Sequence, residues 1–228
     1  MTYVGISILG VLAILTVIGL LNGVYAKLRI QPAIAFLIIA SMIAGILLPA
    51  IRIGTMFSFS IGGFLIPFFI SAYLMYQAAR RNEFWRCLIG EAVVALTVFF
   101  LMYYIPIDTT AMAILSAVAI GLVAAAISYL IGRNGRSAVV SSVMGIYLAQ
   151  IAVFVVNVIR GIDTPLNLGT GGIFDAIVLS VVAAIVLAEF SEALALGADR
   201  ANAAAAGQRS RHRAAQSEQA EFYEFKKR

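Results

Sequence analysis

Long runs of apolar residues recur along the chain, and they constrain its fold more than any other feature. The stretch from 110 to 132, TAMAILSAVAIGLVAAAISYLIG, contains no charged residue. A helix of about 20 such residues crosses the hydrocarbon core of a bilayer. Only 12% of all residues are charged, about half the fraction found in soluble domains. The alternating polarity of a transmembrane barrel is absent from the sequence. These features predict an integral membrane protein built as a helical bundle.

Seven apolar stretches are separated by short segments that contain Arg, Gly, Pro and Asn. The first stretch has no basic residues before it and no small-residue cleavage pattern after it, so we interpret it as a spanning helix and not as a signal peptide. The predicted fold class is therefore all-α. The predicted transmembrane helices are residues 4–26, 32–51, 60–79, 86–105, 110–132, 138–159 and 172–196.

Basic residues are distributed unevenly between the two sides that this topology defines. Of the 16 Lys and Arg residues, only Arg52 and Arg160 fall on one side. Because short cytoplasmic loops are enriched in Lys and Arg, we expect the N-terminus outside and the C-terminus inside. The basic residues of the cytoplasmic side are Lys27, Arg29, Arg80, Arg81, Arg86, Arg133, Arg136, Arg200, Arg209, Arg211, Arg213, Lys226, Lys227 and Arg228.

The sequence divides into a transmembrane domain, residues 1–197, and a polar cytoplasmic tail, residues 198–228. The tail is interpreted as a solvated extension, with partner binding as the alternative. The net charge of +5 fits arginines beside an anionic inner leaflet, and no nucleic-acid partner is expected. The expected location is the cell membrane, within the lipid bilayer. Further expected partners are a small solute or ion, a second copy of the chain, or subunits of a membrane complex.

Two glycine doublets begin apolar stretches in similar contexts. The segments IRIGTMFSFSIGG and IRGIDTPLNLGTGG both run from Ile-Arg through an irregular stretch to Gly-Gly. The sequence separation is 108 between Arg52 and Arg160, and 109 between Gly62 and Gly171. This pattern predicts a parallel repeat of helices 1–3 and 5–7, with the fourth helix as a linker. Chance similarity is the alternative, because the first helices of the two halves do not resemble each other.

The segments FSFSIGGFLIPFFISAYL and LGTGGIFDAIVLSVVAAIVLA resemble an uncharacterised family of polytopic membrane proteins from archaea and bacteria, the domain of unknown function DUF1614. The resemblance covers roughly residues 25–190 and implies no activity. It implies an acid near the outer end of the preceding helix, where this chain has Asn157, which weakens any mechanism that needs two carboxylates. The family positions that it implies are Gly62, Gly63, Pro67, Gly171, Gly172 and Asp175.

Asp175 is the foremost candidate for a functional residue, because an ionisable group at membrane depth is costly. If the last helix begins at Gly172, Asp175 lies in its first turn, where the helix dipole favours a carboxylate. If the preceding segment instead folds back into the bundle, Asp175 lines a cavity and binds a solute or carries a proton. Its expected partner is then Arg160, which shares a helical face with Asn157.

The glycine doublets also have two interpretations. Small residues let neighbouring helices approach closely, which is a purely structural role. Unpaired N–H groups at a helix start can also bind an anion or a polar substrate. With the polar residues above, they complete a candidate polar site of Asp175, Arg160, Asn157, Gly171, Gly172, Gly62 and Gly63.

Several function classes are excluded by residues that the chain lacks. His212 is the only histidine and Cys87 the only cysteine, so neither a metal site nor a cofactor is expected. A retinal Schiff base needs a lysine in the last helix, which contains none. An intramembrane aspartyl protease needs two facing carboxylates, and this alternative is disfavoured because Asp108 and Asp163 fall in predicted loops.

Two functions remain, and neither assigns catalytic residues. A small-solute or ion transporter-like protein fits the glycine repeat, the broken helix starts and the intramembrane acid. A structural or assembly subunit of a membrane complex needs only the packing glycines and the basic tail. The transporter-like function is favoured over the assembly role, and an enzymatic activity is not favoured.

Overall fold

The chain forms two compact units, Met1–Ala188 and Glu189–Arg228. The predicted cytoplasmic tail, residues 198–228, lies outside the described residues, as does the predicted continuation of the first helix beyond residue 19. A computed structural model describes residues 4–19, 31–80, 83–105, 109–191 and 193–197.

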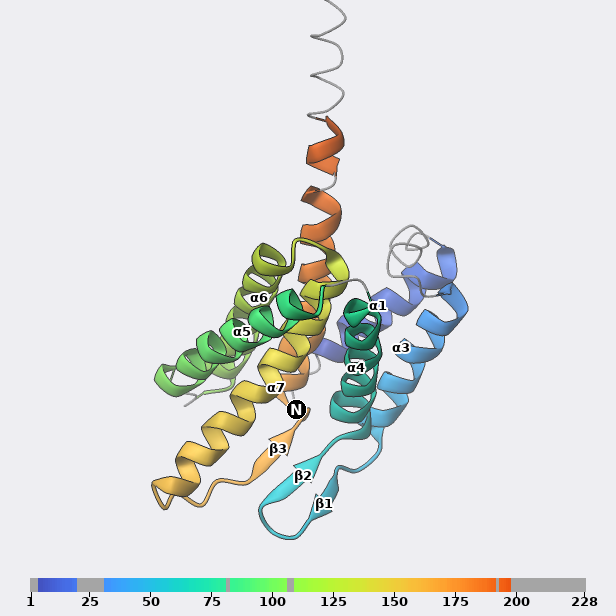
Figure 1. Cartoon of the computed structure of the whole chain (residues 1–228). Coiled ribbons are helices and arrows are strands. Elements are labelled where there is room, and N and C mark those ends of the chain that lie inside the picture. The colour runs from blue at the N-terminus through green and yellow to red at the C-terminus, as the bar shows by residue number, and fades with distance from the viewer. Residues whose placement is uncertain (1–3, 20–30, 81–82, 106–108, 192, 198–228) are drawn as a thin grey trace, which may run out of the picture. The chain divides into compact units, whose positions relative to one another are not determined.

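Helices dominate the described part of the chain (Figure 1). Over the described residues, five helices are long and apolar enough to cross a membrane, which confirms the predicted apolar helical bundle. Two more, with 15 and 16 residues, are shorter than the roughly 20 residues that a crossing needs, so the count of seven spans stays a prediction. The helices are α1 (Val4–Ile18), α3 (Pro32–Leu47), the π-helix η1 (Ile61–Leu65) that continues into α4 (Ile66–Ala79), α5 (Phe84–Tyr104), α6 (Thr110–Gly132), α7 (Gly135–Ile159) and the C-terminal helix (Gly172–Gly197).

Polar side chains fix the starts of α6 and α7. The Thr109 hydroxyl accepts a hydrogen bond from the Met112 N–H at 3.2 Å, and the Asn134 side chain accepts one from the Ser137 N–H at 2.7 Å. These caps satisfy N–H groups that have no partner within the helix. Arg133 ends α6 with a left-handed φ of 54°, so that α7 can begin two residues later and pack back against α6.

α7 packs against α4, α5 and α6. The Cys87 thiol of α5 donates to the Ser137 hydroxyl at 3.2 Å, and the Ser141 hydroxyl donates to the Cys87 carbonyl at 2.9 Å. A Cβ on Gly145 would lie 2.6 Å from Val94 Cγ1. Small residues allow such close approach between membrane helices. They recur at every fourth position of α7, as Ser137, Ser141, Gly145 and Ala149.

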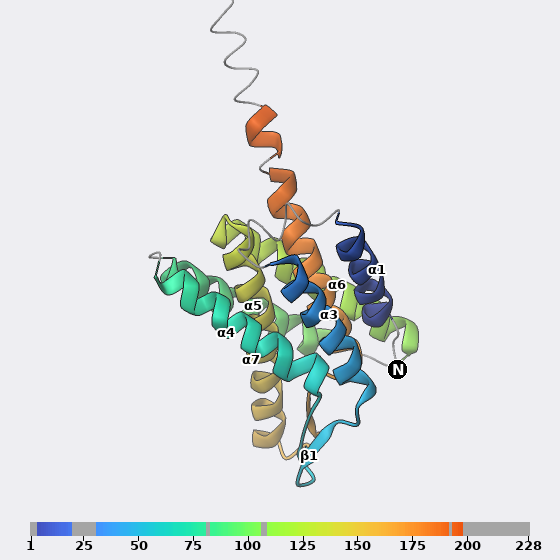
Figure 2. The same cartoon turned by 90° about the vertical axis from the view of Figure 1, so that its right-hand side faces the viewer.

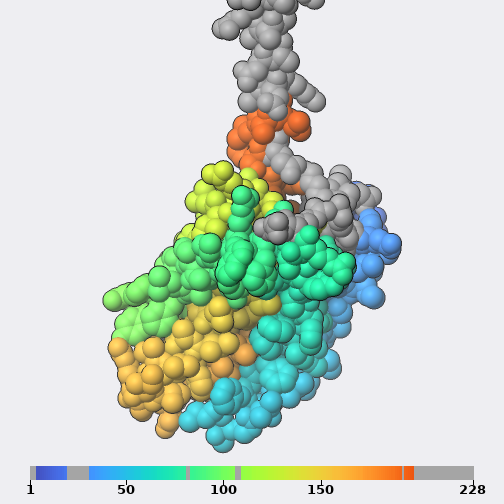
Figure 3. All heavy atoms as spheres, in the orientation of Figure 1, coloured from blue at the N-terminus to red at the C-terminus, as the bar shows by residue number. Residues whose placement is uncertain are grey.

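The outward faces of the helices are apolar. Figure 2 shows α3 between α1 and α4, in agreement with their packing contacts. Figure 3 shows a face on which α4, α5 and α7 lie side by side. Large side chains project from these helices, and Phe69 is 65% exposed and Leu96 59% exposed. Such a surface suits lipid, because the backbone groups are already paired within the helices.

Three short strands form a sheet near the ends of these helices: β1 (Ile51–Ile53), β2 (Phe57–Phe59) and β3 (Leu166–Leu168). β1 is antiparallel to β2, and β2 is parallel to β3. Ser58 lies opposite Asn167, at a separation of 109 residues, which equals the separation of the glycine doublets. The all-α prediction is therefore incomplete. Segments expected to be irregular pair their backbone N–H and C=O groups with one another, which satisfies hydrogen-bonding groups that lie outside the helices.

Candidate functional site

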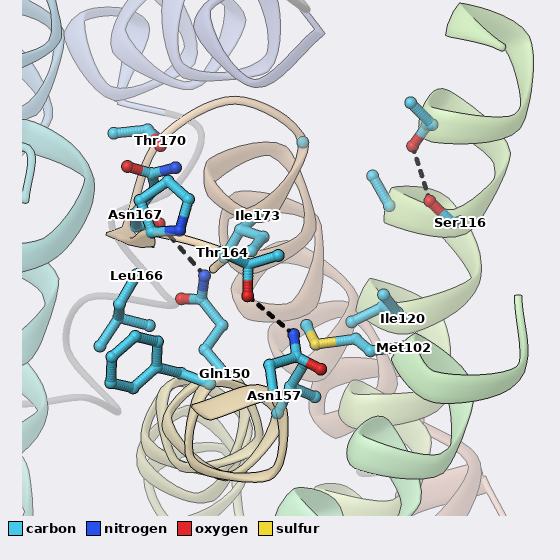
Figure 4. Close-up of a pocket in the computed structure, with 16 residues that line it drawn as sticks. Met102, Ser116, Ile120, Gln150, Asn157, Thr164, Leu166, Asn167, Thr170 and Ile173 are labelled. Atoms are coloured by element: carbon cyan, nitrogen blue, oxygen red, sulfur yellow. Dashed lines mark hydrogen bonds between the residues drawn. The ribbon is translucent and has the colours of Figure 1, made fainter. Parts of the chain in front are cut away.

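A cavity of about 440 Å³ lies within the first unit, between α6, α7 and the segment that contains β3 (Figure 4). Met102, near the end of α5, lines it as well. Concave sites between the helices of a bundle are common places for small ligands. The polar side chains that line the cavity are Ser116, Gln150, Asn157, Thr164, Asn167 and Thr170.

Amides and hydroxyls supply all the side-chain polarity of this cavity, and none of the described residues that line it carries a charge. Asn157 Nδ2 donates to Thr164 Oγ1 at 3.0 Å, and Gln150 Nε2 donates to the Asn167 carbonyl at 3.2 Å. Figure 4 shows both bonds reaching from α7 to the segment that follows it. They hold this segment over the cavity and leave the side-chain Oδ1 of Asn157 to accept from another donor.

Gln150 has an unsatisfied hydrogen-bonding atom. Its side chain is only 6% exposed, and its Oε1 is buried without a partner. A buried acceptor without a partner costs about 1–3 kcal/mol, so such atoms in native structures call for an explanation. Gln150 lines the cavity, but this oxygen is buried behind the wall and is not exposed to a molecule in the cavity.

The cavity is bounded on one side by the apolar core. Ala117 and Ile120 of α6 line the cavity and also belong to the core cluster that contains Ile146 and Ile177. Ile173 lines the cavity and packs against the same cluster. The core side chains are close-packed and leave little space for water. A polar molecule in the cavity therefore meets an apolar barrier on that side.

Asp175 lies outside this lining. The C-terminal helix begins at Gly172, so Asp175 is in its first turn, with only 4% of its surface exposed. Its Oδ1 accepts a hydrogen bond from the Gly5 N–H at 2.8 Å. Gly5 is in the first turn of α1, where N–H groups have no partner within the helix. The carboxylate therefore caps α1 while it lies at the positive end of its own helix.

The packing around Asp175 is tight. A Cβ on Gly5 would lie 2.6 Å from the Asp175 Oδ1. A cavity beside the carboxylate measures about 10 Å³ and has Val4, Ile114 and Leu179 in its walls. This space is about that of one water-sized probe. The environment accounts for the buried acid structurally, by pairing it with a helix N-terminus.

The structure separates Arg160 from Asp175 and from the cavity lining. Arg160 is the C-terminal cap residue of α7, and its guanidinium donates to the Tyr103 hydroxyl. Its Cζ lies 5.0 Å from the centre of the same ring, a cation–π distance. Asn157, one turn earlier, lines the cavity instead. The described residues include no group of three His, Cys, Asp or Glu side chains that could hold a metal ion.

The first glycine doublet is packed against backbone on both sides. A Cβ on Gly62 would lie 2.2 Å from the Met42 carbonyl oxygen of α3. A Cβ on Gly63 would lie 1.8 Å from the Gly169 carbonyl oxygen. Distances this short exclude any side chain at either position. Close packing is therefore the role that the contacts give to Gly62 and Gly63.

The second doublet has open space around it. Gly171 has a φ of 60°, and no atom lies within 4 Å of the place where its Cβ would be. The glycine supplies the left-handed turn before the C-terminal helix. Gly172 lines the cavity, where a Cβ would come no closer than 3.7 Å to its neighbours. Of the predicted polar residues and glycines, Asn157 and Gly172 thus meet at the cavity.

Tyr147 is a residue that the sequence pattern did not single out. Pro67 has no N–H, so the Gly63 carbonyl lacks the donor that an α-helix would supply four residues later. The Tyr147 hydroxyl donates to this carbonyl at 2.7 Å, and its ring packs edge-on to Phe64 at 4.9 Å. The Gly-x-x-x-Pro spacing predicts that the Gly63 carbonyl lacks an N–H donor four residues later. Nothing local in the sequence identifies Tyr147 as the donor that replaces it.

Gln150 of α7 is bonded to β3 and lines the cavity. The signal for this role was its spacing. Gln150 and Asn157 are seven residues apart, which places both amides on one face of α7.

A family model described as "Protein of unknown function (DUF1614)" matches residues 27–187. The match covers more than half of the chain, which therefore belongs to this family, as the sequence resemblance indicated. The comparison with curated proteins gave no match, and neither did the comparison with solved structures.

Proposed function

We propose that this member of the DUF1614 family is a transporter-like membrane protein that takes a small solute into the cavity between α6, α7 and β3. The observation that carries the proposal is a cavity of about 440 Å³ whose lining combines amide and hydroxyl side chains with apolar ones. Solute sites in transporters lie between helices, next to irregular backbone. A purely structural subunit requires no such polar space.

The proposal includes seven spans in the cell membrane, with the N-terminus outside and the C-terminus in the cytoplasm. Its support is the distribution of basic residues over the helix ends. Arg52 is in β1 and Arg160 caps α7 beside the cavity, whereas Arg133 and Arg136 lie where α6 ends and α7 begins. Since basic residues favour the cytoplasmic side, the cavity would open toward the outside.

We further propose that the two glycine segments are parts of a parallel repeat. The parallel pairing of β2 with β3 supports this, because Ser58 and Asn167 are separated by 109 residues, as Gly62 and Gly171 are. Two segments related by an axis along the membrane normal would run in the same direction. In this arrangement the solute cavity belongs to the second repeat. The corresponding glycines of the first repeat, Gly62 and Gly63, are closely packed against backbone.

The test is solute flux through reconstituted full-length protein. We expect vesicles that contain the wild-type chain to swell faster than empty vesicles in at least one osmolyte from a panel of sugars, polyols, amides and salts. Ala113→Phe should reduce this flux by tenfold or more, because Ala113 lines the cavity and the ring would occupy it.

The matched control is Ala111→Phe, which changes an exposed residue at the same end of α6. This variant should keep wild-type flux. Equal flux in the wild type, Ala113→Phe and empty vesicles over the whole panel would contradict the transporter-like proposal. A chain that remains folded only with other subunits would favour the assembly role instead.

A further inference from the structure

We infer that the solute of this cavity is a small uncharged molecule that has both hydrogen-bonding groups and apolar surface. This inference rests on the proposed function and narrows it, because the sequence left open whether the protein handles a solute or an ion. The chemistry of the described lining residues decides between them.

An ion would find no charged partner on the described lining. Every polar side chain there is an amide or a hydroxyl, and Asp175 is turned to Gly5 while Arg160 is bonded to Tyr103. Transfer of an unpaired charge from water into an apolar environment is far more costly than transfer of a neutral polar group that finds hydrogen bonds. The walls therefore favour a neutral guest.

The lining combines polar and apolar side chains. Figure 4 shows Gln150 and Asn157 of α7 on the same part of the wall, and Ser116 of α6 also lines the cavity. Apolar side chains come from the same helices, with Phe154 on α7 and Ile120 on α6. A molecule with polar groups all round would leave some of them without partners against these apolar side chains. An amphipathic molecule matches this mixed lining.

Hydrogen-bonding capacity remains at Asn157. Its side-chain amide donates one N–H to Thr164 and leaves the second N–H and the Oδ1 for other partners. A guest with a donor such as an amide N–H or a hydroxyl can bind near this residue.

The size of the cavity suits a small guest. Its volume of about 440 Å³ lies within the range of small-molecule pockets, about 300–1,000 Å³. A neutral molecule of five to ten heavy atoms fits, with a few waters completing its hydrogen bonds.

The inference can be tested with three probes of nearly equal size: pentanamide, pentanoate and pentylammonium. Binding to the full chain in lipid nanodiscs is measured by saturation-transfer NMR, with empty nanodiscs as the reference for lipid partitioning. We expect pentanamide to bind at least tenfold more tightly than either charged probe. Ala113→Phe should weaken its binding by at least tenfold, and Ala111→Phe should leave it unchanged.

Asn157→Asp provides a test of charge at a fixed position. This half-buried residue lines the cavity, so the new carboxylate supplies the charged partner that the wild-type lining lacks. We expect pentylammonium to become the tightest of the three probes in this variant, with pentanamide weakened by tenfold or more. An unchanged order of affinities would show that the probes bind elsewhere and would overturn the assignment.

Tighter binding of pentanoate or pentylammonium than of pentanamide by the wild-type chain overturns the inference. Binding of none of the probes overturns it as well. The proposed function is judged separately by vesicle flux: salt flux that depends on Ala113 would keep that proposal and discard the neutral solute. Loss of both the probe binding and all flux would discard both.

Discussion

The segments that begin with β2 and β3 share a sequence pattern and differ in what their glycines do. Both strands run in the same direction and are followed by a Gly-Gly doublet and a helix. In the first segment, Gly62 and Gly63 press against the backbone of α3 and of Gly169. In the second, Gly171 has open space around it and Gly172 lines the cavity.

This difference teaches that one local pattern supports two physical roles. The first segment forms a π-helix whose free carbonyl is held by Tyr147, so its start is fixed by contacts on several sides. The second begins an ordinary helix next to a cavity, and its Asp175 caps α1. The first segment is held by close backbone contacts, and the second contributes residues to the proposed solute site.

Among the variants that test this comparison, Gly63→Ala should reduce the stability of the protein most. The new Cβ would lie 1.8 Å from the Gly169 carbonyl oxygen, and backbone cannot yield as a flexible side chain does. Overpacking in a core costs typically 1–3 kcal/mol and sometimes more, so we expect a loss of about 3 kcal/mol or failure to fold. Thermal unfolding in detergent measures it. A midpoint within a degree of the wild type would show that the two segments do not touch here.

Tyr147→Phe should have the next largest effect. It removes the hydroxyl that donates to the Gly63 carbonyl and keeps the ring beside Phe64. A buried carbonyl without its donor costs about 1–3 kcal/mol, and we expect about 2 kcal/mol in the same unfolding experiment. Tyr73→Phe, at an exposed tyrosine of α4, is the matched control and should be neutral. Equal stability of the two variants would contradict the claim that the Tyr147 hydroxyl stabilises the first segment.

Asp175→Ala should have a smaller effect, of about 1–2 kcal/mol, as expected for the loss of a helix-capping side chain. The Gly5 N–H would lose its acceptor, while the new side chain fits the space. Asp175→Asn retains an oxygen acceptor and should recover much of the lost stability. Because Asp175 lies outside the lining of the 440 Å³ cavity, both variants should keep solute flux once folded. If a stable Asp175→Asn protein had no solute flux, Asp175 would have a direct role in transport.

Gly171→Ala should have the smallest effect. Its Cβ meets no atom within 4 Å, but the φ of 60° is retained, and a left-handed conformation costs a residue with a side chain roughly 1–2 kcal/mol. We expect a loss of about 1 kcal/mol in thermal unfolding, well below that of Gly63→Ala. A loss as large as that of Gly63→Ala would mean that the second doublet is packed as tightly as the first, and the contrast between them would disappear.

Much of the helical architecture was predictable, and much of the candidate site was not. Apolar runs and polar breaks predicted the long helices. For Asp175 the sequence left two alternatives, and the helix start at Gly172 corresponds to the first-turn alternative. The partnership with Arg160 belonged to the other alternative. Arg160 stacks on Tyr103, 57 residues away in the sequence, because aromatic and acidic partners compete for a cation and their distances depend on how α5 and α7 pack.

The sequence by itself determined that the chain is an apolar helical membrane protein and where its unusual glycines, amides and acid lie along the helices. Those properties follow from local composition, because each spanning helix pairs its backbone N–H and C=O groups internally and presents apolar side chains to lipid. Only the tertiary structure decided that β2 pairs with β3, that Tyr147 reaches Gly63, and that Gln150 and Asn157 share a cavity while Asp175 caps α1. These contacts join residues far apart in the chain, and their formation depends on which helices pack together and at what distance.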